Sequence, residues 1–245
     1  DGCNNFCSYC IIPYLRGRSR SRSLESAAAE ILSCPAEEVV ITGIDVSSYR
    51  DGARDLADLL RAVKDAKARI RLGSLETHAV TERLLAAAKE VRDFAPHFHL
   101  SLQSGSDAVL RAMNRKYTRA EFLRKAALVR EAFPSAALTT DIIVGFPTET
   151  EEDFEATLAL AEEARFSQIH CFAYSRRAGT AAAKLKELAP QVKKERLGRL
   201  PRQNARTRAR GGEGRVYRRV FRKLHPPVCA RKRQKTHAGA CARMV

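Results

Sequence analysis

Three cysteines, Cys3, Cys7 and Cys10, lie in the opening sequence "DGCNNFCSYC". Thiolates at this spacing are soft ligands that one loop can direct at one metal centre, and they favour iron–sulfur clusters or zinc. Three thiolates suit a [4Fe–4S] cluster with one iron left open, where a small molecule can coordinate. A structural zinc site needs four ligands, and Cys34 is the candidate for the fourth. Three unrelated surface cysteines are the remaining interpretation.

The elements that must position this loop alternate along the chain between about residues 24 and 200. Short apolar runs predict strands, and the amphipathic runs between them predict helices. The expected strands are residues 39–42, 69–74, 97–102, 138–146 and 168–174. The expected helices are residues 24–33, 53–66, 82–93, 119–133 and 151–164. Thr118 with Glu121, and Thr150 with Asp153, are N-terminal capping signals for the last two helices.

This alternation predicts an α/β fold with a parallel sheet, open or closed into a barrel. Polar residues gather just after the expected strands, in "TGIDVSSY", "SLETH", "SLQSGS" and "GFPTETEED". Loops that follow parallel strands share one face, so we expect the functional site there. His97, His99 and His170 lie in apolar strands and are expected to be core or wall residues. Cys34 and Cys171 are expected to be ordinary buried thiols.

The length of the chain and its cysteines limit the class of protein to which it can belong. The 245 residues are enough for one large domain with a substantial core. There is no apolar run long enough to cross a membrane, and the first residues do not resemble a signal peptide. Seven irregularly spaced cysteines argue against a disulfide framework. We therefore expect a cytoplasmic protein, without membrane association, that uses its cysteines for metal or redox chemistry.

The net charge of +16 is unevenly distributed. Residues 201–245 contain 14 basic residues and one acidic residue, whereas residues 1–200 contain 30 and 27. The charge is therefore weak evidence about the partners of the folded part. We expect a domain over residues 1–200, with a cysteine loop at 1–22 and strand–helix repeats at 23–200. Residues 201–245 are expected to be a basic, disordered tail, with RNA binding or a shifted reading frame as alternatives.

The cysteine loop, with Tyr9 before its last cysteine, resembles the cluster loop of the radical S-adenosylmethionine (SAM) superfamily. The string "DGCNNFCSYCIIPYLRGRSRSR" is similar to the methylthiotransferases within it. The closest similarity is to the tRNA methylthiotransferases that act on N6-threonylcarbamoyladenosine. It is carried, in order and spacing over about residues 1–200, by "RIRLGSLETHAVT", "LQSGSDAVLRAMNRKYT", "TTDIIVGFPTETEEDFEAT" and "HCFAYSRRAGTAAA". The branches that act on isopentenyladenosine in tRNA and on a ribosomal protein match less well.

The resemblance implies a partial (β/α) TIM-like barrel and one [4Fe–4S] cluster on Cys3, Cys7 and Cys10, with SAM at the open iron. It implies that the reduced cluster cleaves SAM to methionine and a 5′-deoxyadenosyl radical. The radical takes hydrogen from C2 of the modified adenosine beside the anticodon, sulfur is inserted there, and a second SAM supplies the methyl group. The implied partners are tRNA, SAM and an electron donor such as flavodoxin or ferredoxin, while the cofactor carries the hard chemistry.

The resemblance and the expected strand ends together predict contacts with SAM. Tyr9 would pack near the adenine, with a core aromatic as the alternative. Thr42 and Gly43 would present backbone groups to the amino group of SAM, although a glycine after a strand is also ordinary turn chemistry. The other candidates for contact with SAM or substrate, rather than for bracing a loop, are Asp45, Ser74, Glu76, Gln103, Asp141 and Gly145.

The arginines in "RGRSRSR" are the candidates for contact with RNA. Arg16, Arg18, Arg20 and Arg22 alternate with small residues directly after the cysteine loop. One interpretation is a solvated, flexible charged segment, and the other is contact with tRNA phosphates.

Three departures from the family pattern limit the expected activity. We expect this chain to lack the N-terminal domain that carries a second cluster, the first barrel strand and the small β-rich RNA-binding domain. We therefore expect that it cannot complete methylthiolation by itself. A rival of another class is a non-catalytic RNA-binding module, held together by zinc on Cys3, Cys7 and Cys10, and a third hypothesis is an inactive gene product.

Overall fold

The computed structural model describes the backbone of residues 1–210 and the side chains of residues 1–200. The helices are α1 (Ile12–Arg16), α2 (Leu24–Ser33), α3 (Leu56–Ala62), α4 (Glu82–Glu90), α5 (Asp107–Ala112), α6 (Arg119–Ala132), α7 (Glu151–Glu163) and α8 (Pro190–Arg210). The strands are β1 (Glu38–Ile41), β2 (Arg50–Asp51), β3 (Arg54–Asp55), β4 (Arg69–Leu72), β5 (Ser74–Leu75), β6 (His97–Leu100), β7 (Ala137–Val144) and β8 (Gln168–Ala173).

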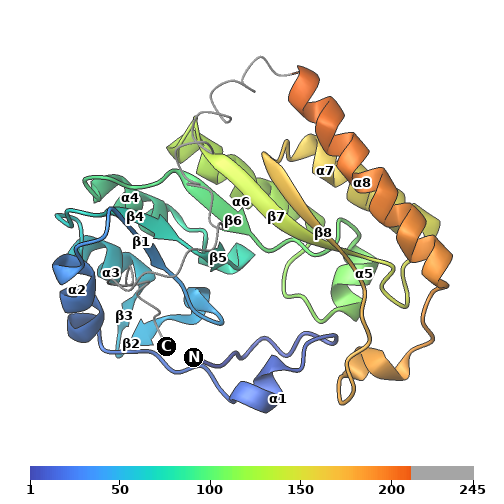
Figure 1. Ribbon diagram of the computed structural model, residues 1–245, viewed down its shortest axis with the longest axis horizontal. Helices are drawn as coiled ribbons and strands as arrows, with labels where there is room; N and C mark the ends of the chain where they lie inside the picture. The colour runs from blue at the N-terminus through green and yellow to red at the C-terminus, as the bar shows by residue number, and fades with distance from the viewer. Residues whose placement is uncertain (211–245) are drawn as a thin grey trace, which may run out of the picture.

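Six of these strands pair in parallel, in two sheets that together form one wall. β1 pairs with β4, and β5, β6, β7 and β8 pair in that order. β4 and β5 belong to one extended segment that is interrupted at Gly73, so the segment joins the two sheets. A Cβ at Gly73 would lie 2.7 Å from Oγ1 of Thr42, so only glycine fits there without displacing Thr42. In the described part of the chain β1 does not pair with β8, and the wall is a partial barrel (Figure 1).

The core lies between this wall and the helices that cover its outer side. Strand residues alternate, so that Phe98 and Leu100 of β6 are fully buried while the residues between them face the other side. Phe122 of α6 and Phe154 of α7 are also fully buried. Burying one such side chain stabilises the fold by about 1.5–3 kcal/mol. The helices are therefore attached to the strands by their apolar faces.

The α/β fold with parallel strands predicted from the sequence is confirmed, and each predicted strand and helix is present. Both predicted capping boxes form, at Thr118 with Glu121 and at Thr150 with Asp153. The predicted helix at residues 53–66 begins later, because β2 and β3 form a hairpin before it. Asp55 then caps α3 by accepting from the amides of Ala57 and Asp58.

The last helix crosses the boundary that the sequence predicts at residue 200. α8 runs to Arg210, so the predicted boundary falls within a helix, and residues 211–245 of the predicted tail lie outside the described residues. α8 packs against β7, β8 and α7, on the outer side of the wall (Figure 1). Arg196 attaches it through a buried ion pair with Glu149, at 2.5 Å between Nη1 and Oε2. None of the described helices is long and apolar enough to cross a membrane.

Candidate active site

The three thiols of the cysteine loop are free, with Cys7 buried and Cys3 and Cys10 half-buried. Burial raises the pKa of Cys3, and the charges of Asp45, Cys7 and Cys10 raise it further. Burial and the charge of Cys7 also raise the pKa of Cys10. Three thiolates this close repel one another, and positively charged iron would relieve that repulsion. The donor set therefore fits an iron–sulfur cluster with three cysteine ligands.

The spacing of the thiols bears on the choice between a cluster and a single zinc ion. Within the described residues, the side chains grouped closely enough to hold one metal ion are His99, Asp141 and His170, and the loop thiols do not form such a group. A mononuclear zinc site draws its sulfur ligands to about 2.3 Å from one ion, whereas a cluster holds each cysteine on a different iron. Three cysteines therefore suffice for a cluster with one open iron, whereas a structural zinc ion would need a fourth ligand.

Hydrogen bonds to α5 and to the turn at Ala181–Lys184 fix the loop in place. The amide of Ser8 donates to the carbonyl of Met113 at 3.0 Å, and the amide of Ala182 donates to the carbonyl of Ser8 at 2.8 Å. Asn114 donates its side-chain amide to the carbonyl of Phe6 at 2.8 Å. At the start of the loop, Gly2 has a φ of +77°, and a Cβ there would lie 2.1 Å from the carbonyl oxygen of Arg18. These contacts determine where the loop and its thiols lie.

Arg115 is a site residue that the sequence analysis did not single out. Its guanidinium donates to Sγ of Cys7 at 3.3 Å and to the carbonyl of Ser101 at 3.2 Å, and it forms an ion pair with Glu76. Its side chain is buried, with only 4% exposed to solvent. Tyr117 receives a hydrogen bond from Nε of Arg115 at 3.1 Å. A buried positive charge therefore lies directly against one predicted cluster ligand.

Glu76, a predicted cofactor contact, lies beside this arginine. Burial raises the pKa of Glu76, although Arg115 favours the charged form. Its own amide donates to the hydroxyl of Ser47 at 2.8 Å. The two side chains border a cavity of about 430 Å³, whose lining also includes Asn5, Cys7, His78 and Tyr117. Glu76 therefore lies close to the cysteine loop and pairs with Arg115, and its contact with SAM or substrate stays a prediction.

Asp45 lies on the other side of the loop, next to Cys3. One of its oxygens, Oδ2, accepts from the side-chain amide of Asn5 at 3.2 Å and from the hydroxyl of Ser48. The other oxygen, Oδ1, is buried and has no hydrogen-bond partner among the described residues. A buried carboxylate oxygen without a donor is costly unless a ligand supplies one. Oδ1 of Asp45 can thus accept a further hydrogen bond, and the contact of Asp45 with SAM or substrate stays a prediction.

Tyr9 packs in a small apolar cluster at the carboxyl ends of the strands. The cluster contains Val109, Met113, Phe146, Tyr174 and Ala182, with Tyr9, Ala112 and Ile143 against it. Burial raises the pKa of Tyr9 well above its ordinary value. Both interpretations of Tyr9, as a core aromatic and as a wall of the adenine site, are compatible with this position.

Gln103 and Gly145 follow β6 and β7 and have unusual backbone conformations. Gln103 has a φ of +68°, which is rare for a residue with a side chain and is typical of functional sites. Its amide donates to the carbonyl of Asp141, and its carbonyl accepts from the amide of Ile143, both at 2.9 Å. Gly145 has a φ of +71°, and a Cβ there would lie 2.5 Å from Cγ of Lys193. The conformation of Gly145 therefore serves packing against α8, and its contact with SAM stays a prediction.

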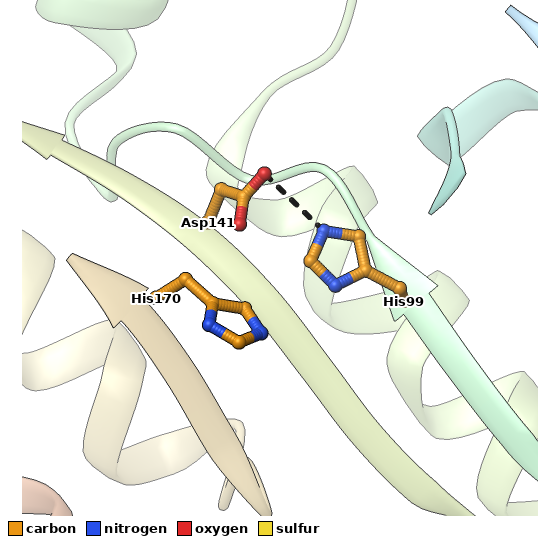
Figure 2. A group of neighbouring side chains, drawn as sticks. All are labelled: His99, Asp141 and His170. Atoms are coloured by element: carbon orange, nitrogen blue, oxygen red, sulfur yellow. Dashed lines mark ion pairs between the residues drawn. The ribbon is translucent and has the colours of Figure 1, made fainter. Parts of the chain in front are cut away.

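The remaining predicted SAM contacts lie at different places along their strands, and their contact with SAM stays a prediction. Thr42 and Gly43 follow β1, and Ser74 begins β5 with its side chain exposed. Asp141 lies in the middle of β7 and faces His99 of β6, with 3.4 Å between Oδ2 and Nε2. His170 of β8 completes the group of three (Figure 2). The prediction of His99 and His170 as wall residues is confirmed, because they lie on strands of the wall.

The four arginines predicted to contact RNA have partners within the protein. Arg16 and Arg20 form ion pairs with Asp1, and Arg22 pairs with Glu30. Arg18 lies over the ring of Phe6, at 4.7 Å from its centroid. These contacts hold the segment after the cysteine loop in a defined conformation. They argue against the interpretation of this segment as fully flexible. Exposed ion pairs of this kind contribute little to stability, so exchanging these partners for phosphate groups would cost little free energy.

Three comparisons with known proteins bear on the family. The profile of the Radical SAM superfamily matches residues 1–161. The tRNA-2-methylthio-N(6)-dimethylallyladenosine synthase of Desulfitobacterium hafniense is 45% identical over 208 residues, which cover 81% of this chain and 46% of that protein. The threonylcarbamoyladenosine tRNA methylthiotransferase MtaB of Chlamydia pneumoniae is 48% identical over 187 residues, which cover 74% and 44%. The chain thus spans less than half the length of these relatives.

Solved structures share the fold at low identity. Coproporphyrinogen III oxidase (HemN) from Escherichia coli aligns with a TM-score of 0.63 and 18% identity, covering 84% of this chain and 50% of that one. The radical S-adenosylmethionine methyltransferase TsrM from Kitasatospora setae aligns with a TM-score of 0.63 and 16% identity, covering 74% and 37%. The profile match covers more than half of the chain, and the fold and cysteine loop agree with it. This chain belongs to the radical SAM superfamily.

Proposed function

We propose that this chain is the radical SAM core of a tRNA methylthiotransferase. The observation that carries the proposal is the loop of three free thiols, fixed at the carboxyl ends of parallel strands in a chain 45–48% identical to tRNA methylthiotransferases. A [4Fe–4S] cluster with SAM bound supplies the reductive cleavage of SAM that starts such a reaction. Cys3, Cys7 and Cys10 would hold that cluster.

The protein's own residues would bind and orient the cofactor. Asp45 offers its unpartnered oxygen to a donor group beside Cys3. Arg115 keeps positive charge against Cys7 and forms an ion pair with Glu76, with only 4% of its side chain exposed. Tyr9 and its apolar cluster offer a surface against which a planar base would pack. Binding, orientation and exclusion of water are the protein's contribution in this proposal.

The substrate that we favour is N6-threonylcarbamoyladenosine beside the anticodon, with methylthio transfer to C2. The higher identity to the threonylcarbamoyladenosine enzyme of Chlamydia pneumoniae supports it. Relatives named for dimethylallyladenosine, which is isopentenyladenosine, support the alternative with a similar identity. An anticodon stem–loop carrying either modification distinguishes the two, and we expect tighter binding of the threonylcarbamoyl form in fluorescence anisotropy.

Anaerobic reconstitution with iron and sulfide tests the proposed chemistry. We expect about four irons per chain, and formation of 5′-deoxyadenosine when SAM and a reductant such as dithionite are added. Cys7→Ala should lose both the iron and the product. Cys171→Ala is the matched control, because Cys171 lies in β8 and outside the loop, and it should keep both. Zinc bound through cysteine sulfur, without 5′-deoxyadenosine, would support the zinc-held RNA-binding module instead.

A further inference from the structure

Two histidines and an aspartate from three neighbouring strands meet on the inner face of the wall. His99 lies on β6, Asp141 on β7 and His170 on β8, and one ligand atom from each lies within 4.8 Å of the others (Figure 2). The strand register brings them together, because His99 pairs with Thr139 and Asp141 pairs with His170. Side chains two residues apart on a strand point to the same face.

The distances suit one small cation. Zinc holds nitrogen ligands at about 2.0–2.1 Å and carboxylate oxygens at about 2.0–2.2 Å, so tetrahedral ligands lie about 3.4 Å from each other. Nε2 of His99 and Oδ2 of Asp141 are 3.4 Å apart. The rings of His99 and His170 are 5.8 Å apart between centroids and tilted by 36°. One ligand atom of His170 lies within 4.8 Å of those of His99 and Asp141.

The charge of the group also favours a cation. Among the described residues, no lysine or arginine forms an ion pair with Asp141, and its carboxylate lies 3.4 Å from Nε2 of His99. Neither ring nitrogen of His170 hydrogen-bonds to protein within the described part of the chain. His170 is exposed on the inner face, and so is Phe172 two residues later, so the face is open to a ligand.

A neighbouring hydroxyl fixes the ring of His99 in the orientation that a metal requires. Nδ1 of His99 shares a hydrogen bond with Oγ1 of Thr139 at 3.0 Å, which directs Nε2 toward Asp141. Histidines that bind metals nearly always use their other nitrogen in this way. His97 contacts the same hydroxyl through Nε2, at 3.2 Å. His97 is thus close to the group but directed at Thr139.

We infer that His99, Asp141 and His170 form a second metal site, separate from the cysteine loop, that binds one zinc ion or a similar divalent transition metal. Two imidazoles and one carboxylate are a common ligand set for zinc sites that keep an open position. The fourth position faces the interior of the wall and would take water or an oxygen anion such as a carboxylate. The inference stands whether or not the proposed tRNA methylthiotransferase activity is correct.

Zinc titration of the full chain tests the site. The chain is first reconstituted with iron and sulfide, so that the loop cysteines are occupied, and is then titrated with zinc against a chromophoric chelator. We expect one zinc per chain, and X-ray absorption at the zinc edge should show nitrogen and oxygen ligands without sulfur. His170→Ala and Asp141→Asn should each weaken binding by at least about 100-fold, and Thr139→Val by about 10-fold.

His78→Ala is the matched control, since His78 is not a proposed ligand and has no contact with Thr139, and this variant should bind zinc as the unaltered chain does. Far-ultraviolet circular dichroism and iron content verify that each variant is folded. Equal zinc affinity in the unaltered chain and in folded His170→Ala would overturn the inference. Sulfur in the zinc shell of the unaltered chain would also overturn it, because it would place the ion on cysteines, and this result needs no variant.

Discussion

The guanidinium of Arg115 lies 3.3 Å from the sulfur of Cys7, and only 4% of the arginine side chain is exposed. The two residues are 108 positions apart in the chain. Hydrogen bonds and positive charge at a cysteine sulfur raise the reduction potential of an iron–sulfur cluster, because they favour the extra electron. We therefore expect Arg115 to raise the reduction potential of the predicted cluster through its contact with Cys7.

Replacing Arg115 should make the cluster harder to reduce. For Arg115→Gln we expect a midpoint potential more negative by tens of millivolts, measured by a redox titration followed by electron paramagnetic resonance. Arg115→Lys keeps the charge and should restore part of the shift. Lys116→Gln removes a neighbouring exposed charge and should leave the potential unchanged. Equal potentials in Arg115→Gln and Lys116→Gln, at equal iron content, would rule out the role.

The buried pair of Glu149 and Arg196 should be a large contributor to the attachment of α8. Their side chains are 1% and 6% exposed. Arg196→Met would leave the carboxylate buried without its partner, which costs about 3–5 kcal/mol. The double variant with Glu149→Gln should be less destabilised than Arg196→Met alone. Urea unfolding measures both, and an exposed pair serves as control: Arg199→Met should cost under about 1 kcal/mol.

Replacement by alanine should destabilise the fold at Gly105 and stabilise it at Gly198. A Cβ at Gly105 would lie 2.6 Å from Cα of Thr157 and 2.8 Å from the carbonyl oxygen of Ala156, so the loop after β6 and α7 must separate. We expect Gly105→Ala to destabilise the fold by about 1–3 kcal/mol. Gly198 lies in α8 with nothing within 4 Å of such a Cβ, and Gly198→Ala should stabilise by up to about 1 kcal/mol. Thermal unfolding distinguishes them, and a lower Tm for Gly198→Ala would contradict this account.

The thiol of Cys171 should be unreactive at neutral pH. Burial raises its pKa to about 11. At pH 8 roughly one molecule in 1,000 then carries the reactive thiolate, which is over 100-fold below an unperturbed thiol with a pKa of about 8.5. Alkylation by iodoacetamide, followed by peptide mass spectrometry, should be slow at pH 8 and about tenfold faster for each pH unit up to 11. Labelling at pH 8 as fast as in urea would refute the prediction.

The capping box of α6 should give a pH-dependent contribution to stability. Hydrogen bonds from the backbone and hydroxyl of Thr118 lower the pKa of Glu121. Because its pKa is lower in the folded state, the carboxylate stabilises the fold fully above the unfolded pKa of about 4.3. This contribution is lost as pH falls through the lowered pKa. In thermal unfolding, the Tm of Glu121→Gln should therefore be lower than that of the unaltered chain at pH 7. The two Tm values should converge as pH falls below the lowered pKa.

The sequence predicted the elements well where short-range rules apply. The helix at residues 24–33 is present with those bounds, and the capping signals at Thr118 and Thr150 start their helices. Caps and hydrophobic periods act over a few residues, so they can be recognised in one stretch of sequence. The hairpin at residues 50–55 and helix α5 were missed because they are too short to show a period.

The candidate site likewise has one part that the sequence predicts and one part that only the tertiary structure shows. The sequence by itself determined the cysteine loop, since Cys3, Cys7 and Cys10 are neighbours in the chain, and it determined the parallel strands whose ends receive that loop. Only the tertiary structure placed Arg115 on Cys7 and brought His99, Asp141 and His170 together. Those contacts depend on how strands pair and on where a loop crosses a distant helix. Such long-range registers are set by packing of the whole domain, which no local pattern specifies.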